Sequence, residues 1–342
     1  MKVSRNFRMN ANLLEREINE WNTPSCVFED GTPVIATLNG GFQRLFTTGW
    51  DWTESLTQVE LIKTNFPDAG IAALAEAAYW KHYAWYERGN GVASSIKPEG
   101  WKIFNERLVK AEKVLIDSKS YAAELPNWYV EMITVQIGLN RSETEREQTF
   151  LEGTNKFKTY YPIYYAMLSS QLPKWGGSWL NIDNTINLSV ENTKISDRNA
   201  MYSRLYSSVY VNLLAEESFF KDTLVSWPKM KQGYEDMLIQ YPNSKFNLNR
   251  FAMFACKAED KDTFLALRKK IGEDVMVEAW AKNPNWLSPA EKPILNPMPL
   301  RSRTNPSSVG QMYMPRIVYS EPIEKQGQKS LNLCESKFGY LK

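Results

Sequence analysis

Hydrophobic residues recur at helical spacing along most of the chain, and the clearest case is residues 68–88. Five positions there follow one another by four, three, four and three residues, and so line one face of a helix: Ile71, Ala75, Ala78, His82 and Trp85. A neighbouring stripe carries more alanines together with Trp80. Small alanines let partner helices approach closely, and the tryptophans fill the space between them. The pattern predicts a helix that is buried on two sides and ends at Gly89.

Helix-start and helix-stop residues punctuate the chain from residue 51 to residue 280. Asp51 followed by Glu54 has the spacing of an N-cap and its N3 acid. Ser142 followed by Glu145 fits the capping box, in which two backbone N–H groups are satisfied reciprocally. Residues 259–274 (EDKDTFLALRKKIGED) carry acids at the entry, lysines in the last turn and a glycine beyond it. These signals predict successive helices.

An aromatic residue directly before proline marks three junctions, each between a helical segment and a segment rich in alanine and aromatics: Phe66-Pro67, Tyr161-Pro162 and Tyr241-Pro242. Proline ends the preceding helix but is accepted in the first turn of the next one. Helices joined by short turns pack antiparallel, and stacked pairs build arrays of the tetratricopeptide (TPR) kind. We therefore predict an all-α fold, an irregular TPR-like or solenoid-like array of antiparallel helix pairs, with a compact irregular helical domain as the alternative.

The two ends of the chain differ from the middle. Residues 10–21 look helical, and residues 32–38 contain β-branched side chains before the turn signal Asn39-Gly40-Gly41, which allows a short hairpin. Eight of the 17 prolines lie after residue 282, and proline blocks helix propagation. The expected organisation is an N-terminal lead over residues 1–50, a helical-repeat-like domain over residues 51–282 and an extended proline-rich tail over residues 283–342.

Charge and composition exclude several classes of protein. The 342 residues include 41 Lys and Arg against 39 Asp and Glu, a net charge of +2, whereas nucleic-acid binding needs clustered cations. There is no apolar run long enough for a membrane span and no signal-peptide pattern, so the expected compartment is the cytoplasm. We expect neither a nucleic-acid nor a membrane partner.

The few cysteines and the lone histidine argue against metal and triad chemistry. Cys26, Cys256 and Cys334 are scattered and odd in number, which argues against a disulfide scaffold or a zinc site. His82 could act as a general base near neutral pH, but its place on an apolar stripe favours an interior or half-buried histidine. We expect no metal and no cofactor.

The segment around Lys174, Trp175, Gly176 and Gly177 is the most unusual in the chain, because two glycines lie between two tryptophans where a helix must end. One interpretation is a ligand or anion site, with free backbone N–H groups, Lys174 as the charge and indole rings as walls. The other interpretation, which we favour, is a tight interhelical turn whose tryptophans pack into the core. The spacing of a phosphate-binding P-loop is missing.

Three further residues are candidates for binding. Trp85 and Arg88 end the aromatic helix, where the arginine could hold a carboxylate in bidentate fashion or form a structural ion pair. Tyr206 is the middle member of a ladder with Tyr202 and Tyr210, spaced by four on one helical face. Their hydroxyls cannot all be buried without partners, so we expect some of these tyrosines to line a groove.

An ordered set of motifs over residues 43–282 resembles the bacterial family called domain of unknown function 4034. The motifs are GWDWTESL, AWYERGNG, WKIFNERLVKAEKVL, ELPNWYVEMITVQIGL, YYPIYYAMLSSQLPKWGGSW, WPKMKQGYEDMLIQYP and LNRFAMFACKAEDKDTF. The resemblance implies a helical fold and supplies no catalytic residues. The family often has arginine before Trp-Gly-Gly, where this chain has Lys174.

These features together predict a non-catalytic module that binds a protein or peptide in a helical groove, with an immunity or adaptor protein as a specific version. The predicted binding residues are Trp85, Arg88, Lys174, Trp175, Gly176, Gly177 and Tyr206. The alternative is an enzyme of unrecognised type, whose pocket would gather Arg88, Lys174, Trp175 and acids from different helices. The oligomeric state is left open.

Overall fold

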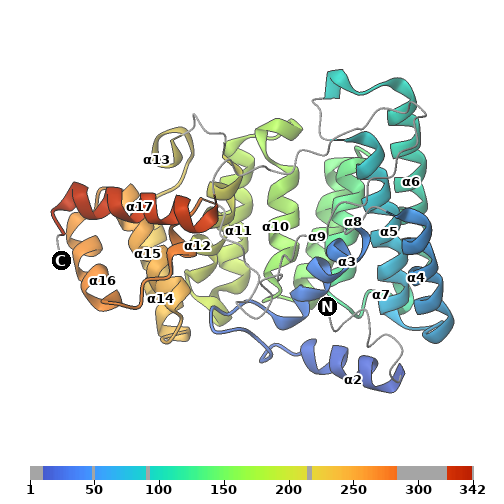
Figure 1. The fold of residues 1–342 in the computed structure, drawn as a ribbon, viewed down its shortest axis with the longest axis horizontal. Coiled ribbons are helices and arrows are strands. Elements are labelled where there is room, and N and C mark those ends of the chain that lie inside the picture. Colours follow the sequence, from blue (N-terminus) through green and yellow to red (C-terminus); the bar gives the residue numbers. More distant parts are fainter. Residues whose placement is uncertain (1–10, 48–50, 90–92, 214–217, 283–321, 341–342) are drawn as a thin grey trace, which may run out of the picture.

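Helices make up nearly all the regular structure in the computed structural model, which describes residues 11–47, 51–89, 93–213, 218–282 and 322–340. Within these ranges, the strand-like pairing consists of an isolated bridge between Val27 and Pro33. The helices stand side by side along the longest axis of the molecule (Figure 1). The prediction of an all-α fold is confirmed.

Two layers of helices form the middle of the chain. The inner layer consists of α5 (Gly70–Arg88), α8 (Asn127–Gly138), α10 (Tyr161–Ser170), α12 (Ala200–Asn212) and α15 (Lys245–Lys257). The outer layer consists of α6 (Pro98–Asp117), α9 (Glu143–Lys156), α11 (Trp179–Asp197), α14 (Trp227–Gln240) and α16 (Lys261–Ile271). Each inner helix packs on the outer helix of its own pair, and successive inner helices also touch one another from α5 to α12. The chain is therefore an irregular array of helix pairs.

Three shorter or peripheral helices complete the array. They are α4 (Trp52–Asn65), α7 (Lys119–Ala122) and α13 (Phe219–Asp222). Helix α4 packs on α5. The rings of Tyr210 and Phe254, 5.3 Å apart, join α12 to α15. The array is thus continuous from α4 to α16.

The helix boundaries follow the punctuation in the sequence. The Asp51 side chain accepts hydrogen bonds from two backbone N–H groups of α4, and Ser142 with Glu145 forms the complete capping box of α9. Asp260 caps α16, which ends at Gly272. The aromatic–proline pairs lie at the entrances of α5, α10 and α15. These local predictions are confirmed.

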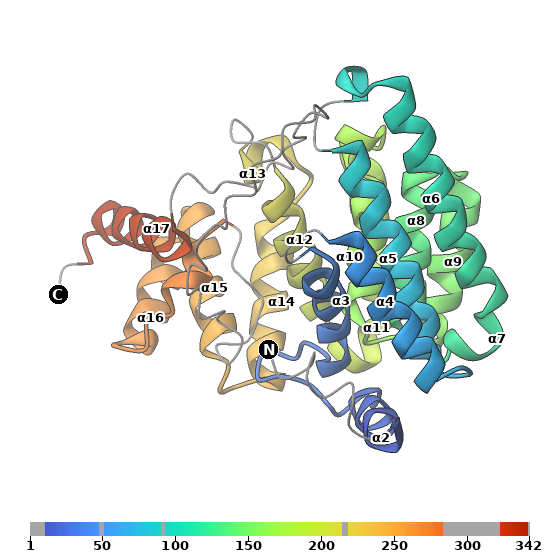
Figure 2. The same ribbon diagram turned by 45° about the vertical axis from the view of Figure 1, so that its right-hand side comes forward.

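The lead, residues 11–47, crosses the inner layer instead of standing apart from it. It consists of α2 (Ala11–Trp21), an irregular segment, the 3₁₀ turn η1 (Val34–Ala36) and α3 (Thr37–Thr47). Helix α3 packs on α5 and buries Phe42 and Phe46 (Figures 1 and 2). The predicted hairpin is wrong, because Asn39, Gly40 and Gly41 lie inside α3, where this burial outweighs the low helix propensity of glycine.

The end of the chain also differs from the prediction. Residues 323–338 form helix α17 (Ile323–Phe338), which packs against α15 and the 3₁₀ turn η4 (Val277–Trp280). Cys334 of α17 forms a disulfide with Cys256 of α15. An extended tail is therefore wrong for this segment, which begins after the last proline. The scattered positions and odd number of the cysteines gave no sign of this single bond. Residues 283–321 and 341–342 lie outside the described residues.

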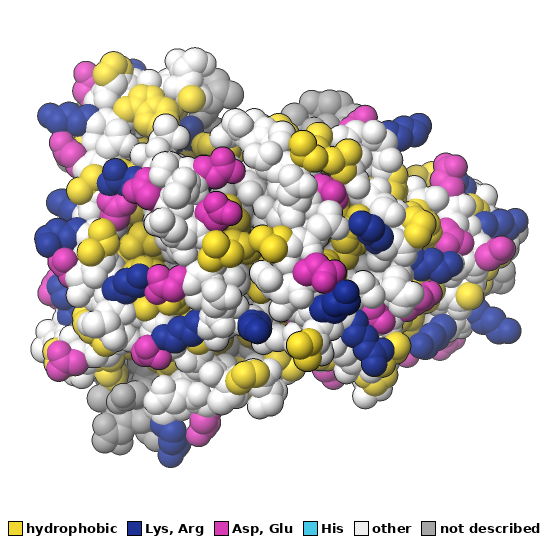
Figure 3. Space-filling model, turned by 180° about the vertical axis from the view of Figure 1, so that it is seen from behind, with side chains coloured by type: hydrophobic (Ala, Val, Ile, Leu, Met, Phe, Trp, Pro, Cys, Tyr) yellow, Lys and Arg dark blue, Asp and Glu magenta, His cyan; other side chains and the backbone are white. Residues whose placement is uncertain are grey.

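The surface carries both signs of charge. On the face seen from behind the view of Figure 1, lysines and arginines are interspersed with aspartates and glutamates (Figure 3). Among the described helices, none combines the length and the apolar character that crossing a membrane requires.

His82 lies under the lead, with its ring 6.3 Å from that of Phe46 in α3. Desolvation and the charge of Lys81 lower the pKa of His82 well below the ordinary value of 6.5. The folded protein therefore keeps the imidazole neutral at a pH where the unfolded chain binds a proton. His82 is thus a half-buried histidine packed under the lead, in line with the interior or half-buried position that the sequence favoured.

We expect His82 to make the protein less stable in mild acid. As pH falls below about 6.5, the imidazole binds a proton in the unfolded state but not in the folded state. This difference lowers the free energy of unfolding by at most about 1.4 kcal/mol for each pH unit. His82→Gln should remove this part of the pH dependence. Denaturant unfolding of both proteins between pH 7.5 and pH 5 checks it, and parallel stability curves would contradict it.

Candidate binding site

Aromatic rings from three elements meet at one end of α5, in what we call the tryptophan–arginine cluster: Trp85, Arg88, Trp101, Phe104 and Trp175. The chain leaves α5 at Gly89, whose φ of 67° suits glycine, and returns as α6, which begins at Pro98. The end of α5 and the beginning of α6 therefore lie together.

The rings of the cluster meet edge to face. The ring centroid of Trp85 lies 5.0 Å from that of Phe104 and 6.2 Å from that of Trp175. Trp101 lies 5.7 Å from Phe104 in the same manner. Such edge-on pairs are favoured by the charge distribution of aromatic rings, so the cluster is a rigid platform.

Arg88 lies inside this cluster, with only 7% of its surface exposed. Its guanidinium carbon is 5.3 Å from the ring centroid of Trp85 and 5.1 Å from that of Trp101, and one nitrogen donates a 3.0 Å hydrogen bond to the carbonyl of Gly89. Burial lowers its pKa. Arg88 thus holds two rings together through cation–π contacts.

Trp175 is the part of the cluster that faces solvent, with 45% of its surface exposed. It ends the 3₁₀ turn η3 (Pro173–Trp175), which follows α10. The indole meets the ring of Trp85 edge to face, and nearly half of its surface is in contact with solvent. The structure thereby brings together Trp85, Arg88 and Trp175, which the sequence proposed from two distant segments.

The two glycines after Trp175 form a tight turn. Gly176 has a φ of 85°, and a Cβ on Gly177 would lie 1.9 Å from the carbonyl oxygen of Gln171. Their N–H groups donate to the carbonyls of Pro173 and Leu172 within the turn. They are not free for a ligand, which supports the interhelical turn. The side chain of Lys174 lies outside the described residues.

Tyr206 does not belong to the cluster or to any groove. Only 1% of it is exposed, and its hydroxyl donates to the carboxylate of Asp183 on α11. Its neighbours Tyr202 and Tyr210 are buried as well, and the Tyr202 hydroxyl accepts the N–H of Ser226. The prediction that this ladder lines a groove is wrong, because all three tyrosines are buried and neighbouring elements supply partners for the hydroxyls of Tyr202 and Tyr206.

Trp101 and Phe104 are cluster residues that the sequence reasoning missed. They stand three residues apart in the first turns of α6, a spacing that places both on one helical face. The same interface continues with Arg107 over the ring of Tyr83 and Lys110 over that of Trp80. Two cations of α6 thus lie over aromatic rings of α5 in the middle of this helix pair.

A second candidate site among the described residues is a charged cavity away from the tryptophan–arginine cluster. An open cavity of about 590 Å³ beside α7 and α9 is lined in part by Lys119, Glu124, Glu152 and Lys156. Its charges are paired, Lys119 with Glu152 at 2.7 Å and Lys156 with Glu124 at 2.6 Å. Across the described ranges, no group of three or more His, Cys, Asp or Glu side chains could hold a metal ion.

Comparisons with known proteins found no match to this chain among family models, curated proteins or solved structures. The resemblance to domain of unknown function 4034 therefore stays a prediction.

Proposed function

We propose that the chain is a non-catalytic interaction module that binds a protein or peptide partner at the tryptophan–arginine cluster. The observation that supports this most is the half-exposed indole of Trp175, packed edge to face against Trp85, whose ring also contacts the buried guanidinium of Arg88. Trp and Arg are enriched among residues that dominate binding energies, and a prefixed ring loses little entropy on binding. The expected groove residue Tyr206 is in the core, so the proposal rests on this end of α5 instead.

We expect Trp175→Ala to weaken partner binding by about 2 kcal/mol, or roughly thirtyfold, as for other central tryptophans of interfaces. The test is affinity purification of the tagged full chain from its native cells, with quantitative mass spectrometry of bound proteins. Ile195→Ala is the matched control, because Ile195 on α11 is also a large, fully exposed apolar residue. Equal recovery of the same stoichiometric partner by wild type and Trp175→Ala would refute the proposal.

The specific version, an immunity or adaptor protein, and the cytoplasmic compartment stay predictions. The bond between Cys256 and Cys334 argues for an oxidising compartment, because disulfides persist there and are rare where thiols are kept reduced.

For the enzyme alternative, Arg88 would have to serve a substrate, yet its guanidinium lies between two indole rings. We therefore prefer the interaction module.

A further inference from the structure

Besides the buried side chains of α3, the irregular segment of the lead is held on the inner layer through its backbone. The carbonyl oxygen of Asp30 accepts a 2.7 Å hydrogen bond from the guanidinium of Arg204 on α12 and a 3.2 Å hydrogen bond from the side-chain amide of Asn247 on α15. The carbonyl oxygen of Ile35 accepts a 3.2 Å hydrogen bond from the side-chain amide of Asn127 on α8. All three donor residues are buried. Three inner helices thus present buried donors to main-chain acceptors of an irregular segment, a chemistry that suits any peptide.

The backbone contacts include a close fit around one glycine. Gly31 adopts a φ of 85°, and a Cβ there would lie 2.4 Å from the ring of Tyr241 and 2.5 Å from the guanidinium of Arg204. The guanidinium carbon of Arg204 also lies 4.4 Å from the ring centroid of Tyr161. Tyr161, Arg204, Tyr241 and Asn247 form what we call the Gly31 site. It admits a glycine turn and excludes a side chain.

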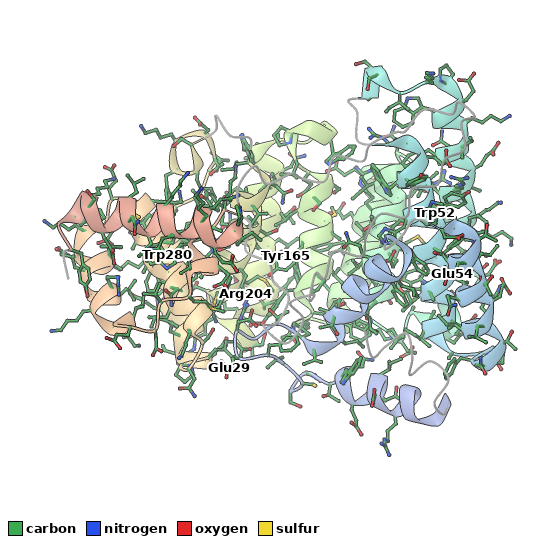
Figure 4. All side chains as sticks on the ribbon, in the orientation of Figure 1. Glu29, Trp52, Glu54, Tyr165, Arg204 and Trp280 are labelled. Atoms are coloured by element: carbon green, nitrogen blue, oxygen red, sulfur yellow. A yellow bond between two sulfur atoms is a disulfide. The ribbon has the colours of Figure 1, made fainter. Side chains whose placement is uncertain are left out.

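The acidic residue before the glycine shapes the turn. The Asp30 carboxylate accepts hydrogen bonds from the N–H and the hydroxyl of Thr32, at 2.8 and 2.9 Å. Figure 4 shows Arg204 between Tyr165 of α10 and Glu29 of the lead. Burial raises the pKa of Tyr165 to about 12, so this neighbour is neutral at physiological pH. The site therefore fits a segment with an Asp-Gly turn beside a buried cation.

The Gly31 site is not saturated by the lead. Arg204 is only 6% exposed, and its Nε atom has no hydrogen-bond partner among the described residues. A buried guanidinium donor without an acceptor is costly, and a segment that supplied one more acceptor would bind there more completely. The lead therefore leaves one buried donor of the Gly31 site, the Nε–H of Arg204, without an acceptor in the described part of the chain.

We propose that the inner layer around the Gly31 site is a second binding site, for an extended peptide with an Asp-Gly turn, which the lead occupies in cis. A tethered segment acts at an effective concentration in the millimolar range, so a free peptide must displace it before binding. The partner is a segment of another protein with this turn chemistry. The site is separate from the cluster at Trp175.

The test uses a labelled peptide with the sequence of residues 24–36, in which Cys26→Ser prevents oxidation, and the full-length protein. Fluorescence anisotropy would measure its binding to wild type, Gly31→Ala and Gly41→Ala. Alanine at position 31 clashes with Tyr241 and Arg204 and should dislodge the lead, whereas a Cβ at position 41 meets nothing within 4 Å. We expect Gly31→Ala to bind the peptide at least tenfold more tightly than wild type, and Gly41→Ala to bind it no more tightly than wild type, because alanine favours the helix α3 of the lead.

Three further variants complete the test. Arg204→Ala added to Gly31→Ala should abolish the gained binding, while Trp175→Ala added instead should leave it unchanged, so this site is judged separately from the cluster. If Gly31→Ala does not fold, Asp30→Ala loosens the turn without adding an atom to the site and should raise affinity about threefold. A folded Gly31→Ala that binds no better than Gly41→Ala, or an Asp30→Ala that binds like wild type, overturns the proposal.

Discussion

Replacing Cys334 by serine is expected to lower the free energy of unfolding by about 4 kcal/mol under oxidising conditions. The bond joins residues separated by 78 positions, and closing so long a loop removes much of the entropy of the unfolded chain. The variant also removes the covalent link between α17 and α15. Denaturant unfolding followed by circular dichroism measures the loss, and limited proteolysis should then cut within α17 before the array.

Two comparisons distinguish the effect of losing the disulfide from any other effect of the serine substitution on stability. Cys26→Ser removes the free cysteine and should change the stability by less than about 0.5 kcal/mol, as expected for a residue outside the core. With reductant present, wild type should fall to the stability of Cys334→Ser. A wild type that keeps its advantage in reductant would mean that packing, not the bond, carries the effect.

Packing does hold α17 as well. A Cβ on Gly327 would lie 1.9 Å from the carbonyl oxygen of Val277 in η4, so the two backbones are in close contact. The buried guanidinium of Arg268 donates a 2.7 Å hydrogen bond to Glu335 of α17. The disulfide therefore adds a covalent link to a helix that non-covalent contacts already hold against the array.

The helical array could be predicted because its signals are local. An N-cap such as Asp51 or Asp260 and a capping box such as Ser142 with Glu145 act within one turn, so a few consecutive residues determine them. Each of the three aromatic–proline pairs is followed by a segment that alternates small and aromatic residues. This pattern likewise indicates, from local sequence, that the helix formed by the segment is buried. These segments became α5, α10 and α15, three of the five inner helices.

The features that the sequence did not predict depend on contacts between residues far apart along the chain. Nothing near Cys334 shows that Cys256 will face it, and nothing near Gly40 shows that Phe42 and Phe46 will be buried on α5. The misassignment of Tyr206 has the same origin, since its hydroxyl partner Asp183 belongs to another helix. The enzyme alternative placed Arg88 and Trp175 in one pocket, but the sequence did not show that the rings of Trp85 and Trp175 would touch.

The two glycines that follow Trp175 should respond very differently to alanine. Gly177→Ala is expected to destabilise the protein by about 3 kcal/mol, because its Cβ would meet the backbone oxygen of Gln171 at 1.9 Å and force the turn open. Gly176→Ala should cost about 1 kcal/mol, since its Cβ meets nothing within 4 Å and only the left-handed backbone is disfavoured. The free energies of unfolding of the two variants give the comparison.

The same pair of variants tests whether the turn fixes Trp175. An opened turn should release Trp175 from Trp85, so the tryptophan emission of folded Gly177→Ala should shift to longer wavelength and partner binding should fall as it does in Trp175→Ala. Gly176→Asn is the control, because asparagine tolerates the left-handed conformation, and it should keep both properties. If Gly177→Ala is no less stable than Gly176→Ala and its emission is unchanged, the turn does not position Trp175, and the indole is held by Trp85 alone.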